Sequence, residues 1–305
     1  MLPPGVLSFP LTAFDADGEL DLPAFSAHLD DQVTSGPAAV FVACGTGEVS
    51  SLSEAEHAEV VRTSVSVVAG RVPVFAGIGG GLATAKTQAE AAAAAGVDGV
   101  LLLPPYLVSG PPAGLLAYVR AVAEVSSTPL IVYRRATNLF GVPTALALLD
   151  VPNVVGIKDG NGDVDTMTRI VTAVRTSEHP RAKDFLFLNG LPTAELSAQA
   201  YRAIGIPQYS SAIFCCAPDI ALAFAAALAA RDDATCQRLL EIFYLPFADL
   251  RDTTPGYHVS LVKAGARVRG FDVGGVRPPL IDPSPEHVSA LTSLITAARA
   301  ELGAA

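Results

Sequence analysis

Two side chains suited to carbonyl chemistry stand where apolar stretches of the sequence end. Lys158 follows the stretch Val154–Ile157, and Tyr133 ends the stretch Pro129–Tyr133, 25 positions earlier. A lysine beside an apolar stretch needs a partner or a function, because an unpaired buried ammonium group is costly. A neutral lysine amine attacks carbonyl carbons to form a Schiff base, and a tyrosine hydroxyl can carry protons for that reaction. Spacing alone leaves open the alternative that Lys158 simply emerges into solvent at the start of a loop.

A glycine-rich turn follows the apolar stretch Ala39–Ala43. Residues 44–48 read Cys-Gly-Thr-Gly-Glu. In a tight turn of this kind the backbone N–H groups can form a nest for a carboxylate, and a threonine hydroxyl adds one more hydrogen bond. An ordinary glycine turn that leads into a helix is the alternative. The residues that would form the carboxylate site are Gly45, Thr46 and Gly47.

Charged and hydroxyl side chains near two further stretches could bind the rest of a polar substrate. Arg134 and Arg135 come directly after the tyrosine. Either guanidinium could bind a carboxylate through two parallel hydrogen bonds. Its positive charge could also favour the neutral form of the lysine amine. Ser210 and Ser211 end another stretch and offer hydroxyl groups. For the serines, an ordinary polar strand terminus is the alternative.

All of these residues stand at the ends of short apolar stretches that alternate with helical patterns. Most of the stretches are continuously hydrophobic, as buried parallel strands are. Eight such units predict a (β/α)8 TIM barrel, in which catalytic residues occupy the carboxyl ends of the strands. A doubly wound open sheet is disfavoured by the strand number and by the lack of a Gly-x-Gly-x-x-Gly motif after the first strand. The predicted strands are Val6–Leu11, Ala39–Ala43, Pro73–Ile78, Gly99–Leu103, Pro129–Tyr133, Val154–Lys158, Phe185–Asn189 and Gln208–Phe214.

Helix signals lie between the predicted strands. Asp21 is expected to cap a helix, and Ser53 begins a capping-box pattern with the glutamate three residues later. Gly96 is placed as the C-terminal cap of an alanine-rich helix. We therefore expect residues 1–217 to form the barrel and residues 218–305 a C-terminal helical extension packed on it, as one structural unit.

The composition excludes several classes of function. The formal net charge of −10 argues against a surface for nucleic acid, which requires clustered lysine and arginine. The five histidines and four cysteines lack the spacing of a metal site or a disulfide framework. The N-terminal residues lack the pattern of a secretion signal, and no apolar stretch is long enough to cross a membrane. We therefore expect a cytoplasmic protein with a small-molecule substrate, and no metal, nucleic-acid or membrane partner.

Several of these motifs together resemble the dihydrodipicolinate synthase / N-acetylneuraminate lyase superfamily. The shared features are the turn at 45–48, Pro104-Pro105-Tyr106, Tyr133 and the Gly-Ile-Lys-Asp-Gly segment at 156–160. The resemblance extends almost end to end. It is strongest to the 5-dehydro-4-deoxyglucarate dehydratases, through the segments Leu7–Pro10, Lys158–Asp163, Gly190–Glu195, Tyr209–Ala212, Val262–Gly265 and Val276–Leu280.

The chain departs from that subfamily at positions near the expected substrate. After the fifth strand, Arg134 and Ala136 replace the asparagine and aspartate that are common in the subfamily. Cys44 and Cys215 stand where a small residue and an asparagine are expected. Leu107 replaces a second tyrosine of the synthase branch, which argues against that branch. These changes bear on the identity of the substrate more than on the lysine chemistry.

The resemblance implies a mechanism and a set of site residues. Lys158 would form an imine with the keto carbon of a 2-keto acid, Tyr133 would relay protons, and the turn at 45–47 would bind the adjacent carboxylate. The implied reaction converts 5-dehydro-4-deoxyglucarate to 2,5-dioxopentanoate, CO2 and water, without a metal or organic cofactor. A class I aldolase acting on another 2-keto acid and a non-catalytic keto-acid binder are the alternatives. The resemblance also implies a homo-oligomer, either a dimer or a tetramer. The residues expected at the far end of the substrate are Arg135, Ser210 and Ser211.

Overall fold

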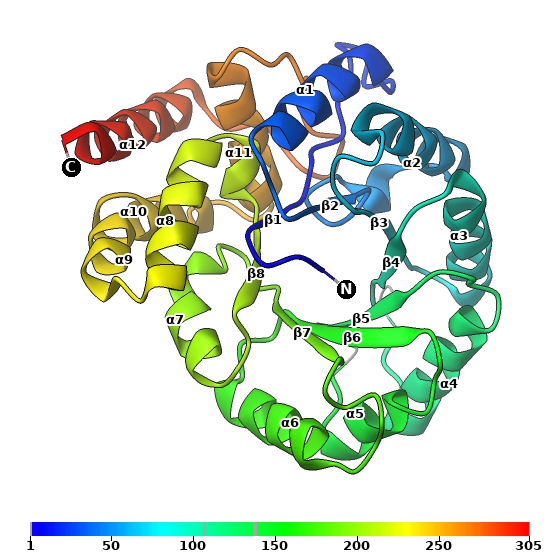
Figure 1. Ribbon diagram of the computed structural model, residues 1–305. Coiled ribbons are helices and arrows are strands. Elements are labelled where there is room, and N and C mark those ends of the chain that lie inside the picture. Colours follow the sequence, from blue (N-terminus) through cyan, green and yellow to red (C-terminus); the bar gives the residue numbers. More distant parts are fainter. Residues whose placement is uncertain (1, 106–107, 137–138, 305) are drawn as a thin grey trace.

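Eight parallel strands form a closed barrel in the computed structural model, which describes residues 2–105, 108–136 and 139–304 (Figure 1). The strands are β1 (Leu7–Ser8), β2 (Ala39–Val42), β3 (Val74–Ile78), β4 (Gly99–Leu102), β5 (Leu130–Arg134), β6 (Val154–Asp159), β7 (Leu186–Asn189) and β8 (Gln208–Ser211). Strand β1 pairs with both β2 and β8, which closes the sheet. The predicted TIM barrel is therefore confirmed, and the open doubly wound sheet is excluded. Tyr106 and Leu107 lie outside the described residues.

A helix follows each strand and covers the outside of the barrel (Figure 1). The predicted helix signals act as expected. Asp21 accepts a hydrogen bond from the backbone of Ala24, Ser53 forms a complete capping box with Glu56, and Gly96 adopts a left-handed conformation. The helices are α1 (Leu22–Thr34), α2 (Glu54–Val68), α3 (Leu82–Ala95), α4 (Pro112–Ala123), α5 (Val142–Leu148), α6 (Val164–Thr176), α7 (Glu195–Ala203) and α8 (Pro218–Ala230).

Strands β1 and β8 are shorter than the sequence predicts by three residues or more. Strand β1 ends at Ser8 because Pro10 follows closely, and proline has no N–H group for the ladder. Strand β8 ends at Ser211, whose hydroxyl accepts a hydrogen bond from the backbone N–H of Phe214. That bond stabilises the tight helical turn η2 (Ile213–Cys215), so the chain leaves the sheet three residues early.

The chain after α8 is helical, as expected. Its elements are α9 (Asp233–Leu239), the π-helical turn η3 (Leu240–Tyr244), α10 (Leu245–Asp252), α11 (Tyr257–Val268) and α12 (Pro285–Ala304). Figure 1 shows them grouped on one side of the barrel, beside α8. Helix α8 follows the eighth strand after the turn η2 and completes the eight strand–helix pairs. The division after residue 217 stays a prediction. Among the described residues, no helix is both long and apolar enough to span a membrane.

The apolar core has two parts, one inside the barrel and one between the strands and the helices. Inside the barrel, Phe9, Phe41 and Phe75 stack with ring centroids 4.8 Å and 4.7 Å apart. The close-packed interior makes the barrel a solid support for side chains at its mouth.

Candidate active site

Lys158 and Tyr133 lie side by side at the mouth of the barrel. They are register partners on β6 and β5, so both side chains leave the sheet at the same level. The lysine side chain is buried, and its Nζ lies 4.2 Å from the centroid of the Tyr133 ring and 4.3 Å from that of Phe9. Burial against two aromatic rings excludes the alternative of a lysine in open solvent.

The Tyr133 hydroxyl makes hydrogen bonds with Gly190 and Arg135. It donates to the backbone oxygen of Gly190 at 2.7 Å and accepts from Nη1 of Arg135 at 3.3 Å. The guanidinium can therefore stabilise negative charge on the phenolic oxygen while its proton is away. This arrangement suits a side chain that passes protons to and from an imine.

Two glycines make room for this pair. A methyl group at Gly190 would lie 2.5 Å from Cε of Lys158, and one at Gly160 would lie 2.6 Å from the Tyr133 hydroxyl oxygen. Both distances are far inside van der Waals contact. The glycines that follow β6 and β7 thus allow the lysine and the tyrosine to pack closely.

The glycine-rich turn faces the same cleft, although only in part. Gly45 and Thr46 line the cleft. Gly47 does not; it is buried, and its backbone oxygen accepts a hydrogen bond from Thr12. Within the described part of the chain, the backbone N–H groups of Thr46 and Gly47 have no protein acceptor. The turn therefore borders the cleft through Gly45 and Thr46, and the Thr46 backbone N–H has no partner among the described residues.

An ion pair behind the turn holds it in place. Glu48 adopts a left-handed conformation with φ of 53°, and its Oε1 lies 2.8 Å from Nζ of Lys263 on α11. Its Oε2 accepts a hydrogen bond from the backbone N–H of Arg277 at 3.0 Å. Both side chains of the ion pair are buried. The C-terminal helices therefore fix a turn that borders the cleft.

The two arginines after Tyr133 have different surroundings. Arg135 lines the cleft. Arg134 points to the opposite side of β5, where it pairs with Asp159 at 2.7 Å and donates to the backbone of Phe140. Both partners of this pair are buried outside the barrel wall. The expectation that Arg134 serves the lysine or a substrate is therefore wrong, because alternate residues of a strand face opposite sides.

The same alternation separates the two serines of β8. Ser210 lines the cleft. Ser211 is fully buried on the other side, where its hydroxyl donates to Oε1 of Glu195 at 2.5 Å. Burial raises the pKa of Glu195 to about 7, and the serine hydrogen bond opposes that rise. Ser211 therefore does not reach the cleft, contrary to the expectation that it binds the far end of a substrate.

Most of the departures from the subfamily lie away from the cleft. Cys215 is fully buried, and its Sγ lies 3.1 Å from the backbone oxygen of Phe9. Of the described departures, only Cys44 lines the cleft. Burial raises the pKa of the Cys44 thiol to about 12, although Lys158 opposes the rise. Burial therefore disfavours the thiolate form of Cys44, which is the form that acts as a nucleophile.

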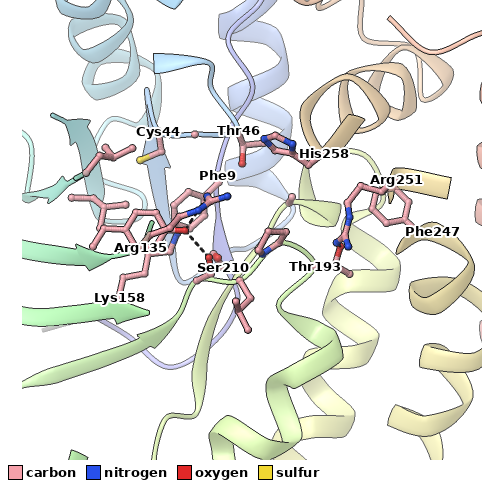
Figure 2. Close-up of a pocket in the computed structure, with 18 residues that line it drawn as sticks. Phe9, Cys44, Thr46, Arg135, Lys158, Thr193, Ser210, Phe247, Arg251 and His258 are labelled. Atoms are coloured by element: carbon pink, nitrogen blue, oxygen red, sulfur yellow. Dashed lines mark hydrogen bonds between the residues drawn. The ribbon is translucent and has the colours of Figure 1, made fainter. Parts of the chain in front are cut away.

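Several residues that line the cleft were missed by the sequence analysis. Phe9 follows β1 and Thr193 follows β7, so strand ends gave a signal for both. Phe247, Arg251 and His258 come from the C-terminal helices, where no local pattern marks them (Figure 2). Within the described residues, no three His, Cys, Asp or Glu side chains are grouped to hold a metal ion.

Comparison with known proteins agrees with this geometry. A family model described as the dihydrodipicolinate synthetase family matches residues 2–298. A Streptomyces coelicolor protein named probable 5-dehydro-4-deoxyglucarate dehydratase 1 is 51% identical over 294 residues, which cover 96% of this chain and 92% of that protein. A Variovorax paradoxus protein named probable 5-dehydro-4-deoxyglucarate dehydratase is 44% identical, over 96% of this chain and 95% of that protein.

The barrel also superposes on solved structures. The crystal structure of dihydrodipicolinate synthase from Bacillus clausii matches with a TM-score of 0.87 at 27% identity, over 97% of each chain. The resemblance seen in the sequence motifs is thus confirmed. This chain belongs to the dihydrodipicolinate synthetase family.

Proposed function

We propose that this protein is a Schiff-base lyase that converts 5-dehydro-4-deoxyglucarate to 2,5-dioxopentanoate, CO2 and water. The observation that carries the proposal is the buried Lys158, packed against Tyr133 in a cleft whose described lining contains no carboxylate. The relatives at 44% and 51% identity, named as dehydratases for this substrate, support its identity. The absence of Cys215 and Arg134 from the cleft removes two arguments for a different substrate.

The proposed reaction begins with attack of the Lys158 amine on the keto carbon, which loses its oxygen as water and becomes a protonated imine. The imine draws electrons from the neighbouring carbon, which gives up a proton. The enamine so formed expels the hydroxyl group one carbon further along as water. This step leaves a double bond conjugated with the iminium group.

The conjugated iminium then accepts the electron pair of the bond to the far carboxylate, which leaves as CO2. Protonation of the resulting dienamine, tautomerisation of the enol at the carbon that lost CO2 to an aldehyde, and hydrolysis of the imine release the product and regenerate the lysine amine. The electron sink is the imine itself, so the proposed chemistry requires no metal or organic cofactor. Tyr133, whose ring packs against Nζ of Lys158, would carry the protons of imine formation and of the adjacent carbon.

The remaining cleft residues would orient the substrate. The free N–H groups of the turn at Thr46 and Gly47 would bind the carboxylate beside the keto group, which makes the later steps unimolecular. Ser210 would contact a substrate hydroxyl group, and Arg135 would contact the far part of the substrate.

Borohydride trapping tests the imine. Incubation with pyruvate or the proposed substrate and borohydride should add the mass of the reduced adduct to the protein. The Lys158→Ala variant should give no adduct, whereas Lys183→Ala, which alters an exposed lysine, should react like the unchanged protein. An unchanged mass for the unaltered protein would disprove the imine, and loss of trapping in both variants would indicate general damage.

Product analysis separates the proposed reaction from its alternatives. Release of CO2 and 2,5-dioxopentanoate from 5-dehydro-4-deoxyglucarate supports the dehydratase. Formation of pyruvate and an aldehyde would instead indicate a class I aldolase, and trapping without turnover would indicate a keto-acid binder.

The expected dimer or tetramer and the cytoplasmic location stay predictions. Light scattering would measure the oligomeric state, and cell fractionation would test the location.

A further inference from the structure

The cleft has a charge opposite to that of the chain. The chain contains 30 Asp and Glu residues and 20 Lys and Arg residues. The described lining of the cleft nevertheless includes Lys158, Arg135 and Arg251, and neither Asp nor Glu. Arg251 pairs with Asp252, whereas Lys158 and Arg135 have no carboxylate partner among the described residues, so an anion bound in the cleft would relieve the repulsion among these charges. A substrate with two carboxylates matches this arrangement better than one with a single carboxylate.

Arg251 reaches the cleft from the last turn of α10. Its side chain is only 13% exposed, and Nη1 donates a hydrogen bond to the hydroxyl of Thr193 at 2.6 Å. The guanidinium also pairs with Asp252, an exposed neighbour whose side chain has 65% of its surface in solvent. Figure 2 shows Arg251 and Thr193 on the helical side of the cleft, away from Lys158 and Arg135 on the strand side.

His258, at the start of α11, connects the two arginines electrostatically. It is exposed and lines the cleft. Partial burial lowers the pKa of His258, and the charges of Arg135 and Arg251 lower it further. Arg135, Arg251 and His258 all line the same cleft, with Arg135 on its strand side and Arg251 on its helical side.

We propose that Arg251, oriented by Thr193 and facing Arg135 across the cleft, binds the second carboxylate of the substrate and makes this enzyme selective for 2-keto dicarboxylates. The inference rests on the proposed imine at Lys158, because that bond fixes the first end of the substrate. Arg251 belongs to the C-terminal helices. These helices thus contribute a specificity-determining residue, in addition to supporting the barrel.

Two keto acids of equal length test the selectivity. Borohydride trapping is measured against the concentration of 2-oxoadipate, a dicarboxylate, and of 2-oxohexanoate, a monocarboxylate. The unaltered protein should be half-saturated at a much lower concentration of 2-oxoadipate. Arg251→Gln should raise that concentration by about 10- to 100-fold and leave the value for 2-oxohexanoate within about twofold, because only the charge-assisted hydrogen bonds are lost.

Three comparisons separate a binding role from a structural one. Arg251→Lys keeps the positive charge but cannot form two parallel hydrogen bonds to a carboxylate. It should therefore lose less affinity for 2-oxoadipate than Arg251→Gln does. Asp252→Asn removes the competing carboxylate and should maintain or improve 2-oxoadipate binding. Arg62→Gln makes the same charge change at an exposed position on α2, and it should leave the half-saturating concentration of both acids unchanged. In the unaltered protein, added salt should weaken the binding of 2-oxoadipate more than the binding of 2-oxohexanoate.

Equal losses for both acids in Arg251→Gln, or no loss for either, would overturn the proposal. Equal half-saturation of the unaltered protein by both acids would overturn it as well, even if the variant did not fold. Pyruvate distinguishes this failure from failure of the proposed function. If pyruvate is trapped but the acids are not distinguished, only the role of Arg251 is wrong; if pyruvate is not trapped, the imine itself is wrong.

Discussion

Removal of the Lys263 charge should destabilise the protein strongly. Lys263 and Glu48 are buried, with Nζ and Oε1 2.8 Å apart, and Nζ also donates to the backbone oxygen of Gly275 at 2.6 Å. Burial lowers the pKa of Lys263, and Glu48 opposes that effect. In Lys263→Met the Glu48 carboxylate remains buried without its partner. Such a break costs about 3–5 kcal/mol.

A double-mutant cycle isolates the ion pair from the packing of the two side chains. Lys263→Met with Glu48→Gln removes both charges, and well-packed neutral replacements of buried ion pairs often cost little. We therefore expect the double variant to be more stable than Lys263→Met by about 2 kcal/mol or more. Urea unfolding followed by far-ultraviolet circular dichroism measures this, because the chain has no tryptophan for fluorescence. Losses in the two single variants that simply add in the double variant would refute the reasoning.

Three further predictions concern titratable groups. Burial raises the pKa of Glu195 to about 7, so ionisation of Glu195 favours the unfolded state. The contribution of Glu195 to the free energy of unfolding therefore falls as pH rises through the window from about 4.5 to 7. Between about pH 5.5 and about pH 8 the free energy of unfolding should fall by about 2 kcal/mol more in the unaltered protein than in Glu195→Gln; equal pH profiles would contradict the raised pKa. Tyr133→Phe keeps the ring but loses the hydroxyl, so steady-state turnover should drop by about 100- to 10,000-fold, and a drop below about tenfold would exclude the proton relay. A thiol reagent should label the folded protein slowly and the urea-unfolded protein at all four cysteines, and fast labelling of the folded protein would contradict burial of Cys44, Cys215, Cys216 and Cys236.

The sequence by itself determined the barrel and the reactive pair. Most of the buried parallel strands lie in continuously apolar stretches, which were visible as local patterns, and so were the caps at Asp21, Ser53 and Gly96. The spacing of Tyr133 and Lys158 by about one strand–helix unit placed them on adjacent strands. The register of β5 and β6 then makes them direct neighbours.

Only the tertiary structure decided which face of each strand a side chain occupies. Arg134 and Arg135 are adjacent in sequence, yet one is buried against the helices and the other lines the cleft. Ser210 and Ser211 are separated in the same way. A strand alternates its side chains, but a short strand that is buried on both faces gives no local signal of which residues face the axis.

The contribution of the C-terminal helices was also a tertiary result. Arg251, His258 and Lys263 follow the last strand by about 40 residues or more, in segments whose helical pattern says nothing about the barrel mouth. Their positions depend on how α10 and α11 pack against the barrel. Contacts between residues distant in sequence arise only when the chain has folded, so the sequence predicted the lysine chemistry and the fold decided what surrounds it.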